Sequence, residues 1–169
     1  MVDLLGQGID RAAGTQPLIA ALAGPPASGQ HGAMIDHVAA LEQSLELAVA
    51  NGGDPQAAIY ARLFALHPAM EAEFWRDKTG RIRGEMLART FEMICDLAAP
   101  HAPEGGWGAA FLGTEAVTHD AYGIARGVFA DFVPIVAAAI AEAGGAGFTP
   151  AMAAAWDLVL ARAAAVLAA

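Results

Sequence analysis

Two polar residues of this 169-residue chain lie among apolar neighbours, where their side chains could do chemistry. His119 closes a short predicted helix, and a neutral imidazole there is a potential nitrogen ligand for a metal ion. Arg83 lies one helical turn before Leu87, on an apolar face where a solvated arginine is unusual. From spacing alone, a lone histidine in such surroundings is more often a packed, hydrogen-bonded residue than a metal ligand. Arg83 can equally pack its stem and extend its charge into water.

The sequence lacks the motifs of several common catalytic and metal-binding sites. The five histidines include no pair four residues apart and no His-Glu-x-x-His pattern, which argues against a zinc site. The sequence also lacks a glycine-rich phosphate loop and a nucleophile elbow. A site built here would therefore depend on single side chains placed by the fold.

Composition limits the class of protein. Eighteen acidic and nine basic residues give a formal charge of −9, which argues against binding nucleic acid or anionic lipid through a broad basic face. Cys95 is the only cysteine, so no internal disulfide can form, and it is expected to be an inert core thiol. We expect a soluble cytoplasmic protein without a secretory signal or membrane span.

Hydrophobic periodicity predicts an all-α fold with about six substantial helices. The chain is expected to form one domain over 31–169, preceded by an extension over 1–30. Helices are predicted near 32–50, from Asp54-Pro55 to His67, at 82–98, ending near His119, at 126–143, and from Thr149-Pro150 to the C-terminus. A Pro/Gly-rich loop is predicted over 99–114.

The stretch 60–74 predicts a helix, a sharp corner and an aromatic anchor. Pro68 disfavours helical geometry at His67, so the helix carrying Tyr60 should end there. Phe74 then follows Tyr60 by fourteen residues. The pattern alone indicates a buried helix and corner, with Tyr60 as a core tyrosine.

This stretch resembles the second and third helices of bacterial single-domain globins and of flavohaemoglobin globin domains. In those proteins a distal tyrosine precedes, by fourteen residues, the phenylalanine that wedges against haem. The tract 83–94 is similar to the distal helix of globins, with Arg83 and Leu87 at its usual Gln or His and the apolar residue four positions later.

Two later tracts extend the resemblance. Residues 119–124 are similar to the proximal histidine and the corner after it, and 148–156 to the start of the final helix. The four tracts occur in order over roughly 32–168.

The resemblance implies a globin-like fold that binds haem b, with His119 as the ligand of the iron. It implies that Tyr60 donates to a bound diatomic gas, either dioxygen or nitric oxide. Arg83 would either donate to the same gas or pair with a haem propionate. The expected pocket walls are Phe64, Phe74, Leu87, Phe91, Tyr122, Ile124, Phe129 and Phe132.

Three departures from the family pattern affect these expectations. Arg83 replaces the commoner glutamine or histidine. His119 follows Arg83 by thirty-six residues, so the Pro/Gly-rich loop is expected to be an insertion. Phe129 stands where flavohaemoglobins have a tyrosine that hydrogen-bonds toward the proximal histidine. With no reductase domain before Ala169, a self-contained nitric-oxide dioxygenase is not expected.

Other functions remain open. The protein could be a nitric-oxide dioxygenase served by an external reductase, or a homo-oligomeric storage or scavenging globin. It could also be a haem-free sensor or interaction module. Glu115 keeps that alternative open, because it lies four residues before His119 and a salt-linked histidine would not bind iron.

Overall fold

The computed structural model describes residues 36–100, 102 and 106–169. Within these residues the secondary structure is helical and contains no strand, which confirms the all-α prediction. The helices are α1 (His37–Gly52), α2 (Gln56–Leu66), α3 (Met70–Glu73), α4 (Arg81–Ala98), α5 (Trp107–Ala121), α6 (Arg126–Ala130), α7 (Phe132–Gly144) and α8 (Pro150–Ala168), with a 3-10 turn η3 (Gly145–Gly147) before α8. The predicted extension 1–30 lies outside the described residues.

Capping residues set several of these boundaries. Asp36 accepts a hydrogen bond from the Ala39 N–H at 3.1 Å, so α1 begins at His37 rather than near residue 32. Thr149 caps α8 through the Met152 N–H at 3.3 Å, as its position before Pro150 predicts. At the end of α2, Pro68 follows the last helical turn as expected.

The fifth helix corrects a prediction. Trp107–Leu112, expected within a loop, form the first turns of a 15-residue α5. The Asp96 carboxylate on α4 accepts a hydrogen bond from the Gly108 N–H at 2.7 Å and so caps this N-terminus from outside the helix. Sequence capping rules search only neighbouring residues, and Asp96 is twelve residues away.

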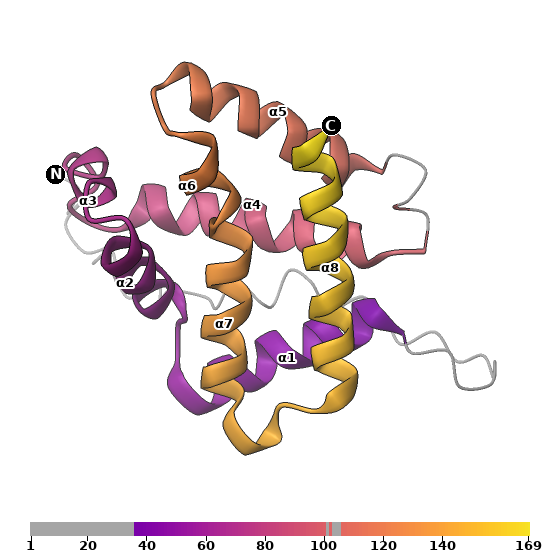
Figure 1. Cartoon of the computed structure of the whole chain (residues 1–169). Coiled ribbons are helices and arrows are strands. Elements are labelled where there is room, and N and C mark those ends of the chain that lie inside the picture. The colour runs from indigo at the N-terminus through magenta and orange to yellow at the C-terminus, as the bar shows by residue number, and fades with distance from the viewer. Residues whose placement is uncertain (1–35, 101, 103–105) are drawn as a thin grey trace, which may run out of the picture.

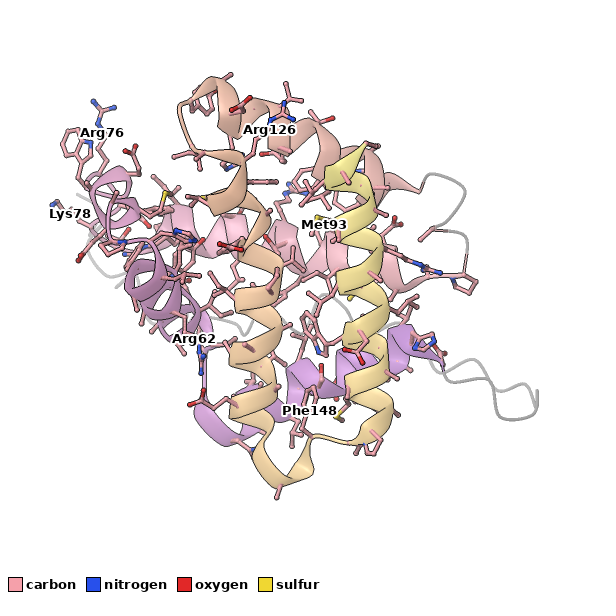
Figure 2. The ribbon with its side chains drawn as sticks, in the orientation of Figure 1. Arg62, Arg76, Lys78, Met93, Arg126 and Phe148 are labelled. Carbon is pink, nitrogen blue, oxygen red and sulfur yellow. The ribbon has the colours of Figure 1, made fainter. Side chains whose placement is uncertain are left out.

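The helices cross in two layers. α7 and α8 lie side by side, joined by the η3 turn, and both pack across α1 (Figure 1). α5 packs on α4 and α8, while α2 packs on α7. Arg62 of α2 forms an ion pair with Glu142 of α7 (Figure 2).

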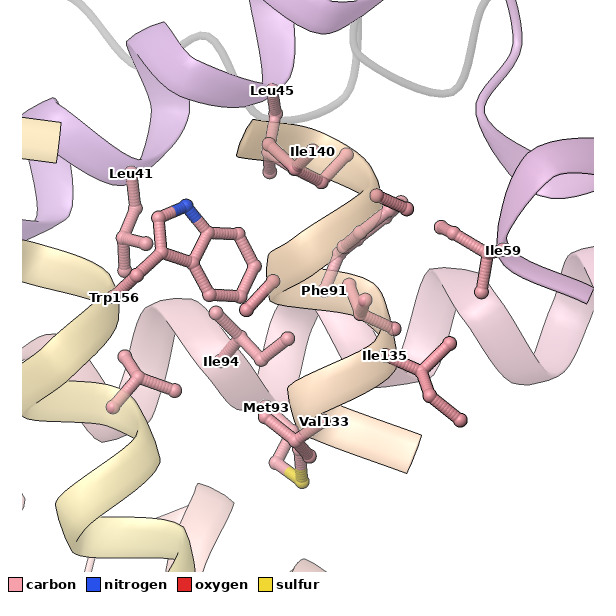
Figure 3. Close-up of a cluster of buried hydrophobic side chains, with 14 of the residues drawn as sticks. Leu41, Leu45, Ile59, Phe91, Met93, Ile94, Val133, Ile135, Ile140 and Trp156 are labelled. Carbon is pink, nitrogen blue, oxygen red and sulfur yellow. The ribbon is translucent and has the colours of Figure 1, made fainter. Parts of the chain in front are cut away.

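The core lies where α1, α4, α7 and α8 meet. Leu41, Ile94 and Ile140 are fully buried there, and Trp156 fills the space between α8 and α1 (Figure 3). The Trp156 indole N–H donates to the Ser44 hydroxyl at 3.0 Å, and this hydroxyl donates to the Leu41 carbonyl at 2.7 Å. The buried polar groups of this contact are therefore paired.

Two apolar stretches, Arg126–Gly147 and Pro150–Ala168, have the length and hydropathy of membrane-spanning helices. Core helices of soluble proteins meet the same criterion, and these stretches supply core residues such as Ile140 and Val159. Glu142 and Asp157 interrupt them, so a search for continuous apolar runs does not find them.

Candidate functional site

A cavity of about 280 Å³ lies among α2, α4, α5, α6 and α7. It brings together residues far apart in the sequence. Of the predicted site residues, those that line it are Tyr60, Phe74, His119, Ile124, Phe129 and Phe132. Leu63, Met70 and Val133 add further apolar wall. The cavity is thus largely apolar, with one imidazole and one phenol among its polar groups.

His119 lies in the last turn of α5, with about a fifth of its side chain exposed. Its Nδ1 lies 2.8 Å from the Glu115 carbonyl oxygen. A carbonyl can only accept, so Nδ1 carries the proton and, in the neutral ring, Nε2 holds the free lone pair. The ring also lies 4.7 Å from that of Phe129, which limits its rotation.

Glu115 approaches the same ring nitrogen. Its Oε2 lies 3.5 Å from His119 Nδ1. The carboxylate therefore acts on the nitrogen that already carries a proton and leaves Nε2 free. In this geometry Glu115 contacts Nδ1 of His119 and does not occupy Nε2, the nitrogen that would bind a metal.

Tyr60, the residue predicted to donate to the ligand, is buried and lines the same cavity. Its ring packs edge-on against Phe74 at 5.4 Å and lies 5.8 Å from Phe132. Its hydroxyl donates to the main-chain carbonyl of Arg83 at 3.1 Å. Burial raises the pKa of Tyr60 well above its usual range, while the Arg83 charge lowers it and that of Asp77 raises it. The phenol is thus a neutral donor.

Arg83 does not line the cavity. Its Nε donates to the Asp77 carboxylate at 3.0 Å, and Nη2 donates to the Asp77 carbonyl at 3.2 Å. To reach either a bound gas or a propionate, as expected from the sequence, Arg83 would have to leave Asp77. Arg83 instead lines a second hollow on the other side of Tyr60.

Asp77 is the partner that sequence reasoning missed. It is buried, and its carboxylate also accepts from the main-chain N–H groups of Ile82 at 3.1 Å and Arg83 at 3.0 Å. Burial opposes ionisation of Asp77, but these hydrogen bonds and the Arg83 charge outweigh it and hold its pKa below the usual range. Asp77 lies four residues before the first residue of α4, outside the usual N-cap position, so a capping search passes over it.

The face that α4 turns to the cavity also differs from the expected one. Leu87 and Phe91 are buried in the core rather than in the cavity wall. Met86, Thr90 and Met93 line the cavity instead. This face is offset by one residue, about 100° around the helix, from the predicted stripe. Both stripes are largely apolar, so periodicity alone could not choose between them.

Two further predicted wall residues lie elsewhere. Phe64 lines the hollow beyond Tyr60, and its ring is 5.8 Å from that of Phe74. Tyr122 is 79% exposed and lines neither the cavity nor the hollow.

The donor set indicates what kind of metal centre the cavity suits. No group of three or more His, Cys, Asp or Glu side chains within 36–100, 102 and 106–169 could hold a metal ion on its own. A single free imidazole nitrogen in an apolar cavity suits a metal carried within an apolar macrocycle. Arg89, on the cavity lining of α4, could pair with acidic groups on such a macrocycle. The residues present therefore fit haem.

Comparison with known proteins bears on the same residues. The sequence matches the Globin family over residues 57–167, about two thirds of the chain. This match contains α3 to α7 entirely and includes both Tyr60 and His119. No curated protein matches the chain.

Proposed function

This chain belongs to the globin family, and we propose that it is a haem b globin of the bacterial single-domain type that reversibly binds dioxygen or nitric oxide. The observation that carries the proposal is the state of His119. Its Nδ1–H is engaged by the Glu115 carbonyl, so Nε2 is available to a metal in an apolar cavity. Haem, when bound, would supply an iron that can bind a diatomic gas.

His119 would be oriented before the cofactor arrives. The hydrogen bond to Glu115 fixes its tautomer, and the Phe129 ring restricts its rotation. The Glu115 carboxylate, 3.5 Å from Nδ1, adds negative charge beside the N–H of the ring. In flavohaemoglobins a tyrosine at the position of Phe129 hydrogen-bonds toward the proximal histidine. In this chain the contacts with Glu115 would orient His119 instead.

Tyr60 would act on the gas from the other side. Its phenol stays protonated, so the O–H can donate a hydrogen bond to a partly negative ligand. To do so, the hydroxyl must exchange its bond to the Arg83 carbonyl for one to the gas. The net gain is then smaller than a new hydrogen bond would give, because one bond replaces another.

Arg89 is assigned to the acidic edge of the cofactor. It lines the cavity and forms exposed ion pairs with Glu85 at 3.5 Å and Glu92 at 3.2 Å. Exposed pairs of this kind are weak, so the guanidinium can exchange partners at small cost. Arg83 is not assigned this role, because the buried Asp77 carboxylate holds it.

Haem uptake tests the proposal. The purified protein is mixed with haemin, and its absorption spectrum is recorded in the ferric, ferrous and CO-bound states. We expect one haem per chain and a sharp Soret band that shifts with CO. In His119→Ala the band should be altered or lost. His67→Ala is the matched control, because His67 has a similar side-chain exposure (21% against 22%) but pairs with Asp131 outside the cavity.

The spectra also separate the alternatives. Failure of the wild type to take up stoichiometric haem would reject the proposal and favour a haem-free interaction module. Equal spectra for wild type and His119→Ala would reject the assigned ligand.

A further inference from the structure

A second hollow, of about 470 Å³, lies on the outer side of Tyr60. α2 contributes Ala57 and Ala61 to it, and the corner before α4 contributes Lys78. All three are exposed, and Lys78 extends from the outer corner of the molecule (Figure 2). The hollow therefore opens to solvent.

Tyr60 lines both the hollow and the cavity. Its ring is the wall that the two spaces share. The wall is held by one hydrogen bond, from the hydroxyl to the Arg83 carbonyl, and by ring contacts with Phe64 and Phe74. Because Tyr60 is fully buried within the core, even a small tilt of its ring must break this hydrogen bond and strain its contacts with Phe64 and Phe74.

Close contacts fix the segments that border the hollow. The Gln56 side-chain amide donates to the Gly80 carbonyl at 2.9 Å. A Cβ at Gly80 would lie 2.8 Å from this amide, and one at Gly84 would lie 2.9 Å from its oxygen. Gly80 also has a φ of 74°, which favours glycine. The Asp77–Arg83 pair fixes the other side of the same corner.

We propose that this hollow is the site through which the small neutral ligand reaches the cavity, and that Tyr60 admits it. The inference rests on the proposed function, in which His119 and Arg89 would hold a macrocycle in the cavity. Tyr60 lines both this cavity and the solvent-open hollow, so the hollow gives a second approach from solvent to the cavity. A diatomic molecule needs only a slight tilt of the ring, whereas a larger molecule would need the three phenylalanines around Tyr60 to move.

Filling the hollow tests this route. In haem-loaded full-length protein, CO is released by a light flash and its bimolecular association rate is measured. Ala61→Trp and, separately, Ala57→Trp place an indole in the hollow. Each should slow association by roughly fivefold or more, which corresponds to about 1 kcal/mol in the barrier. Ala65→Trp is the matched control, since Ala65 is an exposed alanine one turn further along α2 and lines neither the hollow nor the cavity.

The outcomes are distinct. Slow association in both hollow-filling variants, with a normal rate in Ala65→Trp, supports the route. Unchanged rates in both variants, or equal slowing in all three, would overturn it while leaving haem and CO binding intact. A wild type that shows no CO-dependent spectrum would instead overturn the proposed function, and the route with it.

Discussion

The Asp77 carboxylate binds both the main chain and the side chain of Arg83. One of its oxygens accepts hydrogen bonds from both the Arg83 main-chain N–H and the Arg83 Nε–H, each at 3.0 Å. The carbonyl of this same arginine accepts the Tyr60 hydroxyl. Asp77 thus fixes the start of α4 and, through it, the acceptor that holds Tyr60. A residue outside the cavity controls a donor within it.

Asp77 should make stability depend on acidity. Its pKa is lowered in the folded protein, so its contribution is present above the unfolded pKa and is lost as the pH falls through the folded one. We expect the wild type to lose stability below about pH 4, where unfolded aspartate protonates. Asp77→Asn should be less stable at neutral pH and lose less on acidification. Urea unfolding of both proteins from neutral pH to pH 3 measures this, and parallel pH profiles would contradict it.

Tyr60 should give the opposite dependence at high pH. Its pKa is raised by burial, so its contribution is present below the unfolded pKa, near about 10, and is lost as the pH rises toward the folded one. Tyrosinate absorbance should show a step that coincides with alkaline unfolding, and Tyr60→Phe should lack it. At neutral pH we expect Tyr60→Phe to cost about 0.5–1.5 kcal/mol, the net value of one hydrogen bond. A Tyr60 that ionises in the folded protein would refute this account of its burial.

Gly108 should tolerate no side chain. A Cβ there would lie 2.8 Å from the Met93 carbonyl and 3.0 Å from the Asp96 carboxylate, where α5 approaches α4. We expect Gly108→Ala to destabilise the protein by about 1–3 kcal/mol, as overpacking does. Gly127→Ala is the control, because no atom lies within 4 Å of its Cβ position. Thermal unfolding of the two variants compares them, and equal melting temperatures would exclude the close approach.

The contact between Trp156 and Ser44 should matter through its polar atoms. Ser44→Ala leaves the buried indole N–H without its acceptor, at a cost of about 1–3 kcal/mol. Trp156→Phe removes the donor and part of the ring, so it should cost more than the polar loss alone because it also leaves a cavity. Denaturant unfolding measures both, and a Ser44→Ala variant as stable as the wild type would show that water replaces the hydroxyl.

The sequence predicted most of the longer helices, because these carry a stripe of apolar residues at helical spacing and several are bounded by recognisable capping or breaking residues. Three boundaries differ from the prediction: α1 begins at His37, the helix predicted over 126–143 is divided into α6 and α7, and α5 begins earlier than expected. The start of α5 depends on Asp96 from another helix. The site was predicted less completely. α4 has two apolar faces, and which of them meets the cavity depends on how the helix packs, so Met86 and Thr90 replaced Leu87 and Phe91. The position of the Arg83 side chain could not be predicted, because it is set by the ion pair with Asp77, which no sequence pattern indicates.

Chemical rescue tests the central claim, that His119 Nε2 is the ligand of a haem iron, most directly. His119→Gly should leave a space in the cavity that free imidazole can occupy. With haemin alone, this variant should have a weak or altered Soret band, and added imidazole should restore the wild-type ferrous and CO-bound spectra. His67→Gly, whose side chain lies outside the cavity, should behave as wild type without imidazole. A His119→Gly variant that already matches the wild type, with no response to imidazole, would contradict the assignment.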